Sequence, residues 1–232
     1  MNKHLFFAVV ATALVATLVG GGISSAVGSI ATDGAGTVGN AGSTLDTAAM
    51  GPHELIEYSA KRMLVELDAN RPVYAKDPAK LDDLVGNVLL PKFDTEYAAR
   101  RVLGPTWNTA TAEQRKRFIA GFYHSLLHNY GTALLSFTAD RLVILPYKGD
   151  AADKVATVRT EVKRSSGEKV PVFFQLRKTE AGWKAYDVVI DGISYLKSFK
   201  TDYAAEIQQK GLDELIMRLE AQAVGPQAKG SG

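Results

Sequence analysis

The chain has 232 residues, of which 46% are apolar and 22% charged, a balance that allows one globular domain with a sizeable core. Its formal net charge is +2, and no basic stretch is interleaved with aromatic residues, so nucleic acid is not expected among its partners. The absence of cysteine excludes disulfides, thiolate nucleophiles, cysteine-bound metal centres and acylation at a lipoprotein cysteine.

The N-terminus has the features of a secretory signal peptide. Lys3 precedes an apolar run over residues 5–19, and glycines and other small residues follow. The run is shorter than the roughly 20 residues that a membrane-spanning helix needs. We therefore expect a signal peptide over residues 1–26, with cleavage after Ala31 and an uncleaved membrane anchor as the alternatives.

Two segments flank the expected domain. Residues 27–50 are Gly-rich and lack hydrophobic periodicity, which predicts a flexible segment. Residues 223–232 are expected to form a disordered tail. The folded domain is thus expected over residues 51–222.

Helix-boundary residues and apolar spacing predict three helices at the start of this domain. Pro52 opens the first, which is expected to end near Pro72. Asp77 is expected to cap the second helix, and Pro91 ends it. Asp94 is expected to cap the third.

The longest helix is expected over residues 111–138. Thr111 and Gln114 have the spacing of a capping box at its start. Its apolar side is broad, and it comprises Phe118, Ile119, Phe122, Leu126, Tyr130, Ala133, Leu134 and Phe137, widened by Tyr123 and Leu127. A helix this apolar must be covered from more than one direction.

The second half of the domain alternates apolar and polar residues with period two, which predicts strands. We expect these strands over residues 142–145, 155–163, 170–177 and 183–190. The short links between them indicate an antiparallel meander with one buried face. Two last helices are expected to begin at Thr201 and near Gly211. This order predicts an α+β fold in which helices pack on one face of a curved antiparallel sheet.

Several motifs resemble those of the MlaC-type family, also called toluene-tolerance proteins. They are Trp107, Thr111, Gln114, Arg115, Phe118, Phe122, Leu126, Leu127 and Tyr130; the block over residues 183–194; and Ile207, Gly211, Leu215, Ile216 and Leu219. The resemblance spans residues 55–219, and the block over residues 183–194 is its most specific part. The sequence departs from the family in a longer lead segment and in Lys200, where the family often has arginine.

The resemblance implies a non-enzymatic periplasmic carrier that needs no cofactor. Members of this family bind phospholipid and shuttle it between an outer-membrane lipoprotein–porin complex and the ring component of an inner-membrane ABC transporter. They belong to the Mla pathway, which maintains the lipid asymmetry of the outer membrane. The same partners and an apolar cavity between the helices and the sheet are therefore expected here.

A lipid carrier needs such a cavity because exposing two acyl chains to water costs on the order of 20 kcal/mol. The side chains expected to line it are Phe122, Leu126, Tyr130 and Leu134 from the long helix, and Val158, Val162, Phe174, Leu176 and Val188 from the sheet. Periodicity does not distinguish a hollow core from a filled one, so an ordinary core is the alternative for each residue. The resemblance favours the cavity.

The sequence predicts no metal site. His124 and His128 stand four residues apart on the long helix, a spacing that allows two imidazoles to share a metal ion. Residue 125 is serine, however, and no third ligand is evident.

An isomerase-like enzyme with a cone-shaped apolar pocket is the alternative function. Asp187 and Asp191 lie near Tyr186 and Tyr195, and a carboxylate with a phenol could transfer protons. The structural alternative is that Asp187 bonds the backbone or a basic neighbour, while Asp191 and Gly192 form a turn. The chain contains no Gly-rich phosphate loop, nucleophile elbow or dinucleotide fingerprint, so no catalytic residue is predicted.

Overall fold

The computed structural model describes residues 47–224, except residues 137, 151 and 165. The expected signal peptide, the lead segment up to residue 46 and the tail from residue 225 lie outside the described residues, so these assignments stay predictions. Within the described part of the chain, no helix combines the length and apolar character needed to cross a bilayer.

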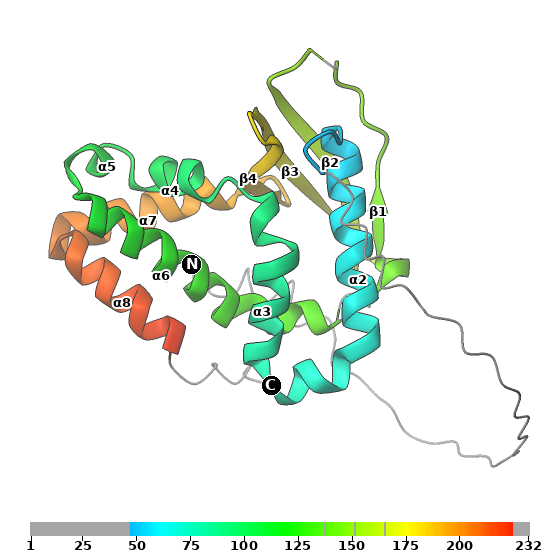
Figure 1. Cartoon of the computed structure of the whole chain (residues 1–232), viewed down its shortest axis with the longest axis horizontal. Helices are drawn as coiled ribbons and strands as arrows, with labels where there is room; N and C mark the ends of the chain where they lie inside the picture. Colours follow the sequence, from blue (N-terminus) through cyan, green and yellow to red (C-terminus); the bar gives the residue numbers. More distant parts are fainter. Residues whose placement is uncertain (1–46, 137, 151, 165, 225–232) are drawn as a thin grey trace, which may run out of the picture.

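Helices form the first half of the described chain, with α2 running alongside the strands and α3 crossing near α6 (Figure 1). In order they are α2 (Pro52–Lys76), α3 (Pro78–Val88), the 3-10 turn η2 (Leu90–Lys92), α4 (Thr95–Leu103), α5 (Thr106–Thr109), α6 (Ala112–Tyr130), and the 3-10 turns η3 (Gly131–Ser136) and η4 (Ala139–Arg141). The expected end of α2 near Pro72 is wrong. The helix continues because Tyr74 is buried in a cluster with α3.

The start of α6 is confirmed and its length is corrected. The Gln114 N–H donates to Thr111 Oγ1 at 3.1 Å, and the Thr111 N–H donates to Gln114 Oε1 at 2.9 Å, which completes the capping box. The helix ends at Tyr130 and gives way to η3, so α2, with 25 residues, is longer than α6, with 19. At this end of α6, α3 lies close to the backbone of Gly131. A β-carbon built on Gly131 would lie only 3.4 Å from Asp82 Oδ1.

In the described part of the chain, five strands form an antiparallel meander in the order β1-β2-β3-β4-β5. They are β1 (Leu142–Ile144), β2 (Val155–Lys163), β3 (Lys169–Thr179), β4 (Gly182–Ile190) and β5 (Ile193–Ser194). The predicted alternation is confirmed, since Ala156 pairs with Leu176, Leu176 pairs with Ala185, and all three are buried. The register of β4 against β3 then shifts, with Tyr186 as the extra residue, and such a bulge bends a strand.

Two helices close the described chain: α7 (Tyr195–Lys210) and α8 (Leu212–Val224). The expected start of α7 at Thr201 is wrong. The helix begins six residues earlier, at Tyr195, and Ser194 caps it, because the Ser194 Oγ accepts a hydrogen bond from the Lys197 N–H at 3.1 Å. The turn before it is confirmed, with Asp191 at φ 50° and Gly192 at φ 77°.

Among the residues that the structure describes, buried apolar side chains form three clusters. The first joins α4, α6, α7 and α8 around Phe118 and Phe122. The second packs α2 against one face of the sheet and includes Leu55 and Val158. The third joins α2 to α3 around Leu67 and Leu81. The predicted α+β class, with helices on an antiparallel sheet, is therefore confirmed.

Candidate functional site

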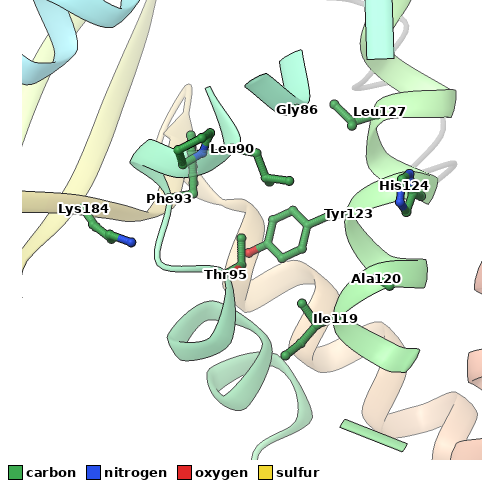
Figure 2. A pocket seen from close by; sticks show the side chains of 11 residues that line it. Gly86, Leu90, Phe93, Thr95, Ile119, Ala120, Tyr123, His124, Leu127 and Lys184 are labelled. Atoms are coloured by element: carbon green, nitrogen blue, oxygen red, sulfur yellow. The ribbon is translucent and has the colours of Figure 1, made fainter. Parts of the chain in front are cut away.

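An apolar cavity of about 350 Å³ lies where α6, α3 and the segment from η2 to α4 meet β4 (Figure 2). Its lining comprises Gly86 of α3; Leu90, Pro91, Phe93 and Thr95 around η2; Ile119, Ala120, Tyr123, His124 and Leu127 of α6; and Lys184 of β4. Ligand pockets commonly measure about 300–1,000 Å³, so this cavity is large enough for a ligand group.

The wall from α6 follows from helical spacing. Ile119, Tyr123 and Leu127 are four residues apart and therefore lie on one face of the helix. Phe118 and Phe122 lie on another face and pack into the cluster with α8. The broad apolar side of α6 thus serves two purposes, since one part fills a core and the other borders the cavity.

Gly86 leaves space in the opposite wall. It lies inside α3, and a β-carbon built on it would meet no atom within 4 Å. Glycine inside a helix costs roughly 0.5–1 kcal/mol relative to alanine. The residue therefore gives up helix stability at a position where a larger side chain would fill the cavity.

Tyr123 crosses the cavity with its hydroxyl directed toward Thr95 (Figure 2). Burial raises the pKa of this hydroxyl above its ordinary value, and the negative charge of Asp94 raises it further. Tyr123 is therefore a neutral phenol at physiological pH. It presents an aromatic ring to the cavity and is not poised to accept a proton.

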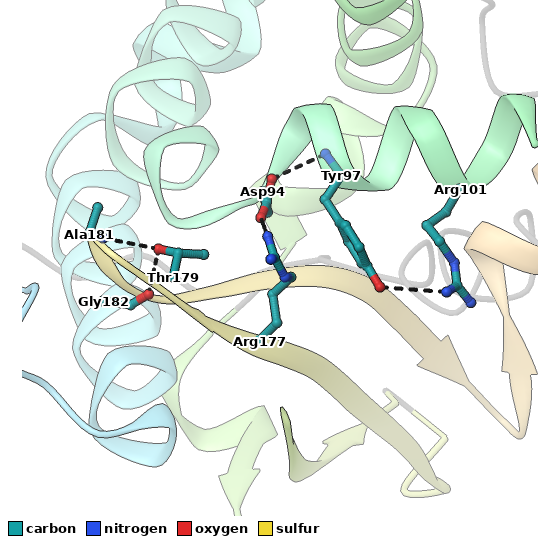
Figure 3. A network of polar contacts seen from close by, with 7 residues as sticks. All are labelled: Asp94, Tyr97, Arg101, Arg177, Thr179, Ala181 and Gly182. Atoms are coloured by element: carbon teal, nitrogen blue, oxygen red, sulfur yellow. Dashed lines mark hydrogen bonds and ion pairs between the residues drawn. The ribbon is translucent and has the colours of Figure 1, made fainter. Parts of the chain in front are cut away.

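A short sheet-like contact fixes the segment from η2 to α4 against β4. Phe93 forms a parallel bridge with Ala185, and the Asp94 N–H donates to the Ala185 carbonyl at 2.7 Å. Asp94 also caps α4, because its Oδ1 accepts from the Tyr97 N–H at 3.1 Å, as the sequence predicted (Figure 3). Its other carboxylate oxygen pairs with Arg177 of β3. The cavity wall is thereby tied to two strands.

A second, polar pocket of about 690 Å³ lies next to the cavity, at the turn between β3 and β4. It is lined by Asp94, Arg177, Lys178, Thr179, Glu180, Ala181 and Lys184. Lys184 is the residue that lines both spaces. The apolar cavity thus ends beside a polar, mostly cationic mouth.

The structure places Phe122, Leu126 and Leu134 outside the lining of this cavity. Phe122 is 4% exposed and packs, with Leu126 beside it, in the cluster around α8. Leu134 belongs to η3 and packs against α2 and α3. Tyr130 is the last residue of α6, and its side chain lies outside the described part of the structure.

The predicted lining residues of the sheet share one face but not one environment. Val158 and Leu176 are fully buried under α2. Phe174, Val162 and Val188 are only half-buried, so the helices leave part of this face open. Phe93 connects the two regions, because it lines the cavity and also packs against the sheet cluster. Whether any of these side chains contacts a ligand stays a prediction.

Sequence reasoning missed Gly86, the η2 segment and Lys184 as members of the site. The sequence marks these places only by Gly86, a glycine within a helix, and by Pro91, a proline that follows it. Nothing in the alternation of β4 distinguishes Lys184 from any other lysine on a polar strand face. Ile119, Tyr123 and Leu127 were recognised as apolar but not as the lining face.

Asp187 has a structural role. Its two carboxylate oxygens accept hydrogen bonds from the Ser194 hydroxyl at 2.6 Å and the Leu196 N–H at 2.9 Å. The carboxylate is buried and holds the start of α7 against β4. These hydrogen bonds explain the aspartate and the serine in the block over residues 183–194. Because both oxygens of Asp187 already accept hydrogen bonds, the carboxylate is not free to accept a proton from a substrate as a general base.

The two histidines lie at the contact between α6 and α3. His124 is exposed at the cavity rim, and His128 is half-buried. Burial raises the pKa of the Asp82 carboxyl on α3. The two histidines act in the opposite direction and lower this pKa, but their effect is smaller. Within the described residues, Asp82 Oδ1 is buried with no hydrogen-bond partner, and no group of three or more His, Asp or Glu is arranged to hold a metal ion.

An α+β domain whose apolar cavity opens beside a cationic mouth has the construction of a small-ligand-binding domain. The amino-acid sequence identifies the protein family to which this domain belongs. The family model described as MlaC protein matches residues 57–221, and the chain belongs to this family.

Two relatives and one solved structure are similar to the chain over most of its length. The toluene tolerance protein ttg2D of Pseudomonas putida is 30% identical over 170 residues, which cover 73% of this chain and 79% of that protein. The intermembrane phospholipid transport system binding protein MlaC of Haemophilus influenzae is 28% identical over 178 residues, covering 75% and 83%. A phospholipid-binding protein from Ralstonia solanacearum, solved in complex with a phospholipid, has the same fold, with a TM-score of 0.70, 23% identity, and coverage of 75% of this chain and 97% of that one.

Proposed function

We propose that this protein is a periplasmic carrier that holds a phospholipid by its acyl chains. In the proposed cycle it exchanges lipid with an outer-membrane lipoprotein–porin complex and with the ring component of an inner-membrane ABC transporter. This exchange serves the lipid asymmetry of the outer membrane. Membership of the MlaC family and the functions for which its relatives are named support the proposal.

The observation that carries the proposal is the apolar cavity between α6 and the η2 segment. Each methylene removed from water contributes about 0.8 kcal/mol, so an acyl chain gains most of its affinity from such a space and little from polar contacts. Tyr123 is a buried, uncharged phenol, so an acyl chain can lie against its ring without burying a charge.

The size of the cavity implies that it opens further when lipid binds. A dry cavity of about 150 Å³ holds a benzene molecule, so about 350 Å³ accommodates only part of a phospholipid. The half-buried Phe174 and Val188 on the sheet offer additional apolar surface, and Phe93 stands between that surface and the cavity. We expect Phe93 and the helices around it to move when the two spaces join.

The contact between α3 and α6 is a suitable place for this movement. Asp82 contributes a buried carboxylate oxygen there without a hydrogen-bond partner among the described residues. An unsatisfied buried oxygen costs about 1–3 kcal/mol, which weakens the contact between the two helices. Gly86 of α3 and Leu127 of α6 line the cavity, so a movement between these two helices changes its size.

Native mass spectrometry of the exported protein tests the carrier function. The expected spectrum contains the protein with added masses that fragment to phospholipids. Protein stripped of lipid is then mixed with phospholipid vesicles and separated from them. Recovery of bound phospholipid supports the proposal, whereas a protein that neither carries lipid nor takes it up would refute it.

A further inference from the structure

Lys184 occupies an unusual place, because among the described residues it is the one that lines both the apolar cavity and the polar pocket. It extends from β4 toward Thr95 and Tyr123 (Figure 2). Its side chain is half-buried, so its methylene stem can lie along apolar surface while the ammonium group stays at the mouth.

The local charge around Lys184 is unbalanced. Lys184 is the direct cross-strand partner of Arg177, and directly opposite residues of an antiparallel pair point to the same face. Two cations placed in this way repel each other. Asp94 pairs with Arg177, whose guanidinium also lies 4.5 Å from the centroid of the Tyr97 ring (Figure 3).

That arrangement leaves the second cation uncompensated. Among the described residues, the Lys184 ammonium has no ion pair or hydrogen bond, and Asp94 is already engaged by Arg177 and by the N-terminus of α4. Glu180 lines the polar pocket but is exposed at the turn and does not pair with Lys184. A site with a free cation beside an apolar cavity suits a ligand that is anionic at one end and apolar at the other.

We infer that Lys184 binds a phosphate group at the mouth of the cavity and so fixes the orientation of the bound lipid. The inference rests on the proposed carrier function and extends it to the head of the ligand. An anionic phosphate ester is common to all phospholipids, so Lys184 distinguishes a phospholipid from a neutral diacylglycerol with the same acyl chains. It does not distinguish one head-group alcohol from another.

A competition between two lipids tests this assignment. Protein stripped of lipid is incubated with vesicles that contain phosphatidylglycerol and diacylglycerol with identical acyl chains, and the bound lipids are quantified by mass spectrometry. Lys184→Gln is expected to lower the ratio of bound phosphatidylglycerol to diacylglycerol about tenfold, which corresponds to about 1.4 kcal/mol. Lys184→Arg, which keeps the charge, is expected to keep the ratio within a small factor of the original.

Lys163→Gln is the matched control, because Lys163 is an exposed lysine at the end of β2 and lines neither pocket. A second arm titrates the stripped protein with inorganic phosphate, followed by ³¹P NMR. Loss of discrimination in the lipid arm with Lys184→Gln assigns the site to a lipid phosphate. Binding of inorganic phosphate that depends on Lys184, without an effect on lipid, assigns it to free phosphate, and both results support a phosphate site.

An unchanged lipid ratio in Lys184→Gln, together with no Lys184-dependent binding of inorganic phosphate, would overturn the inference. The same experiment tests the carrier function independently of Lys184. Uptake of both lipids by the unmodified protein, with no effect of Lys184→Gln in either the lipid arm or the inorganic phosphate arm, refutes only the role of Lys184. If the unmodified protein takes up neither lipid, the carrier function fails, and the inorganic phosphate arm still decides whether Lys184 binds phosphate.

Discussion

Gly86→Leu should block lipid binding without damaging the fold. A β-carbon at this position meets no atom within 4 Å, so the new side chain has space, and that space is the cavity. Each side-chain carbon excludes one ligand methylene at about 0.8 kcal/mol, and a leucine therefore removes about 3 kcal/mol of binding free energy, or roughly 200-fold in affinity. Replacing glycine inside α3 also raises helix propensity by about 0.8–1.0 kcal/mol.

The assay measures phospholipid taken up from vesicles by stripped protein, with thermal unfolding recorded in parallel. Gly86→Ala is the matched control, because it provides the same gain in helix propensity but adds only one methyl group. We expect the alanine variant to be more stable and to bind lipid nearly normally, whereas the leucine variant is at least as stable and binds poorly. Lipid uptake by Gly86→Leu equal to that of the unmodified protein would show that hydrocarbon does not occupy this space.

Three further substitutions test individual features. Asp187→Asn should lower the free energy of unfolding by about 1–3 kcal/mol, because the hydrogen bonds to Ser194 and Leu196 weaken, yet keep lipid uptake; loss of uptake in folded protein would contradict the structural role. Two hydrogen bonds from Arg218 lower the pKa of Glu206. The pair therefore stabilises the fold above the ordinary glutamate pKa of about 4.5, and this contribution is lost as the pH falls through the lowered value. Glu206→Gln should accordingly cost about 1 kcal/mol in urea unfolding at pH 7 and little at pH 3, and an equal loss at both pH values would refute the ion pair as its cause. Because burial raises the pKa of Asp82, its ionised form opposes folding as the pH rises through the raised value, so Asp82→Asn should raise the urea midpoint at pH 7 and not at pH 3; a lower midpoint at pH 7 would contradict this expectation.

The sequence predicted those elements whose boundaries have local signals. The strict alternation over residues 155–163 predicted β2 with its observed bounds, and the capping box predicted the start of α6. The end of α6 was missed because the apolar residues after Tyr130 fit a 3-10 turn as well as an α-helix. The start of α7 was missed because the serine that caps it also belongs to β5.

The candidate site was predictable in kind but not in detail. Apolar spacing identified α6 as a wall, but its two apolar faces look alike in sequence, and only tertiary packing separates Phe122, which meets α8, from Tyr123, which meets the cavity. The role of Phe93 depends on its bridge to Ala185, a contact across 92 residues that periodicity cannot encode. Lipid contact of the predicted sheet residues, including the half-buried Phe174 and Val188, stays a prediction.

Photo-crosslinking measures most directly whether hydrocarbon lies between α6 and the η2 segment. Stripped protein is loaded with a phospholipid that carries a diazirine within one acyl chain, irradiated and mapped by peptide mass spectrometry. If the acyl chain lies in the cavity, adducts form on residues 119–127 and 90–95 and are lost in Gly86→Leu. Adducts confined to exposed residues outside the cavity, with none on these two segments, would contradict it.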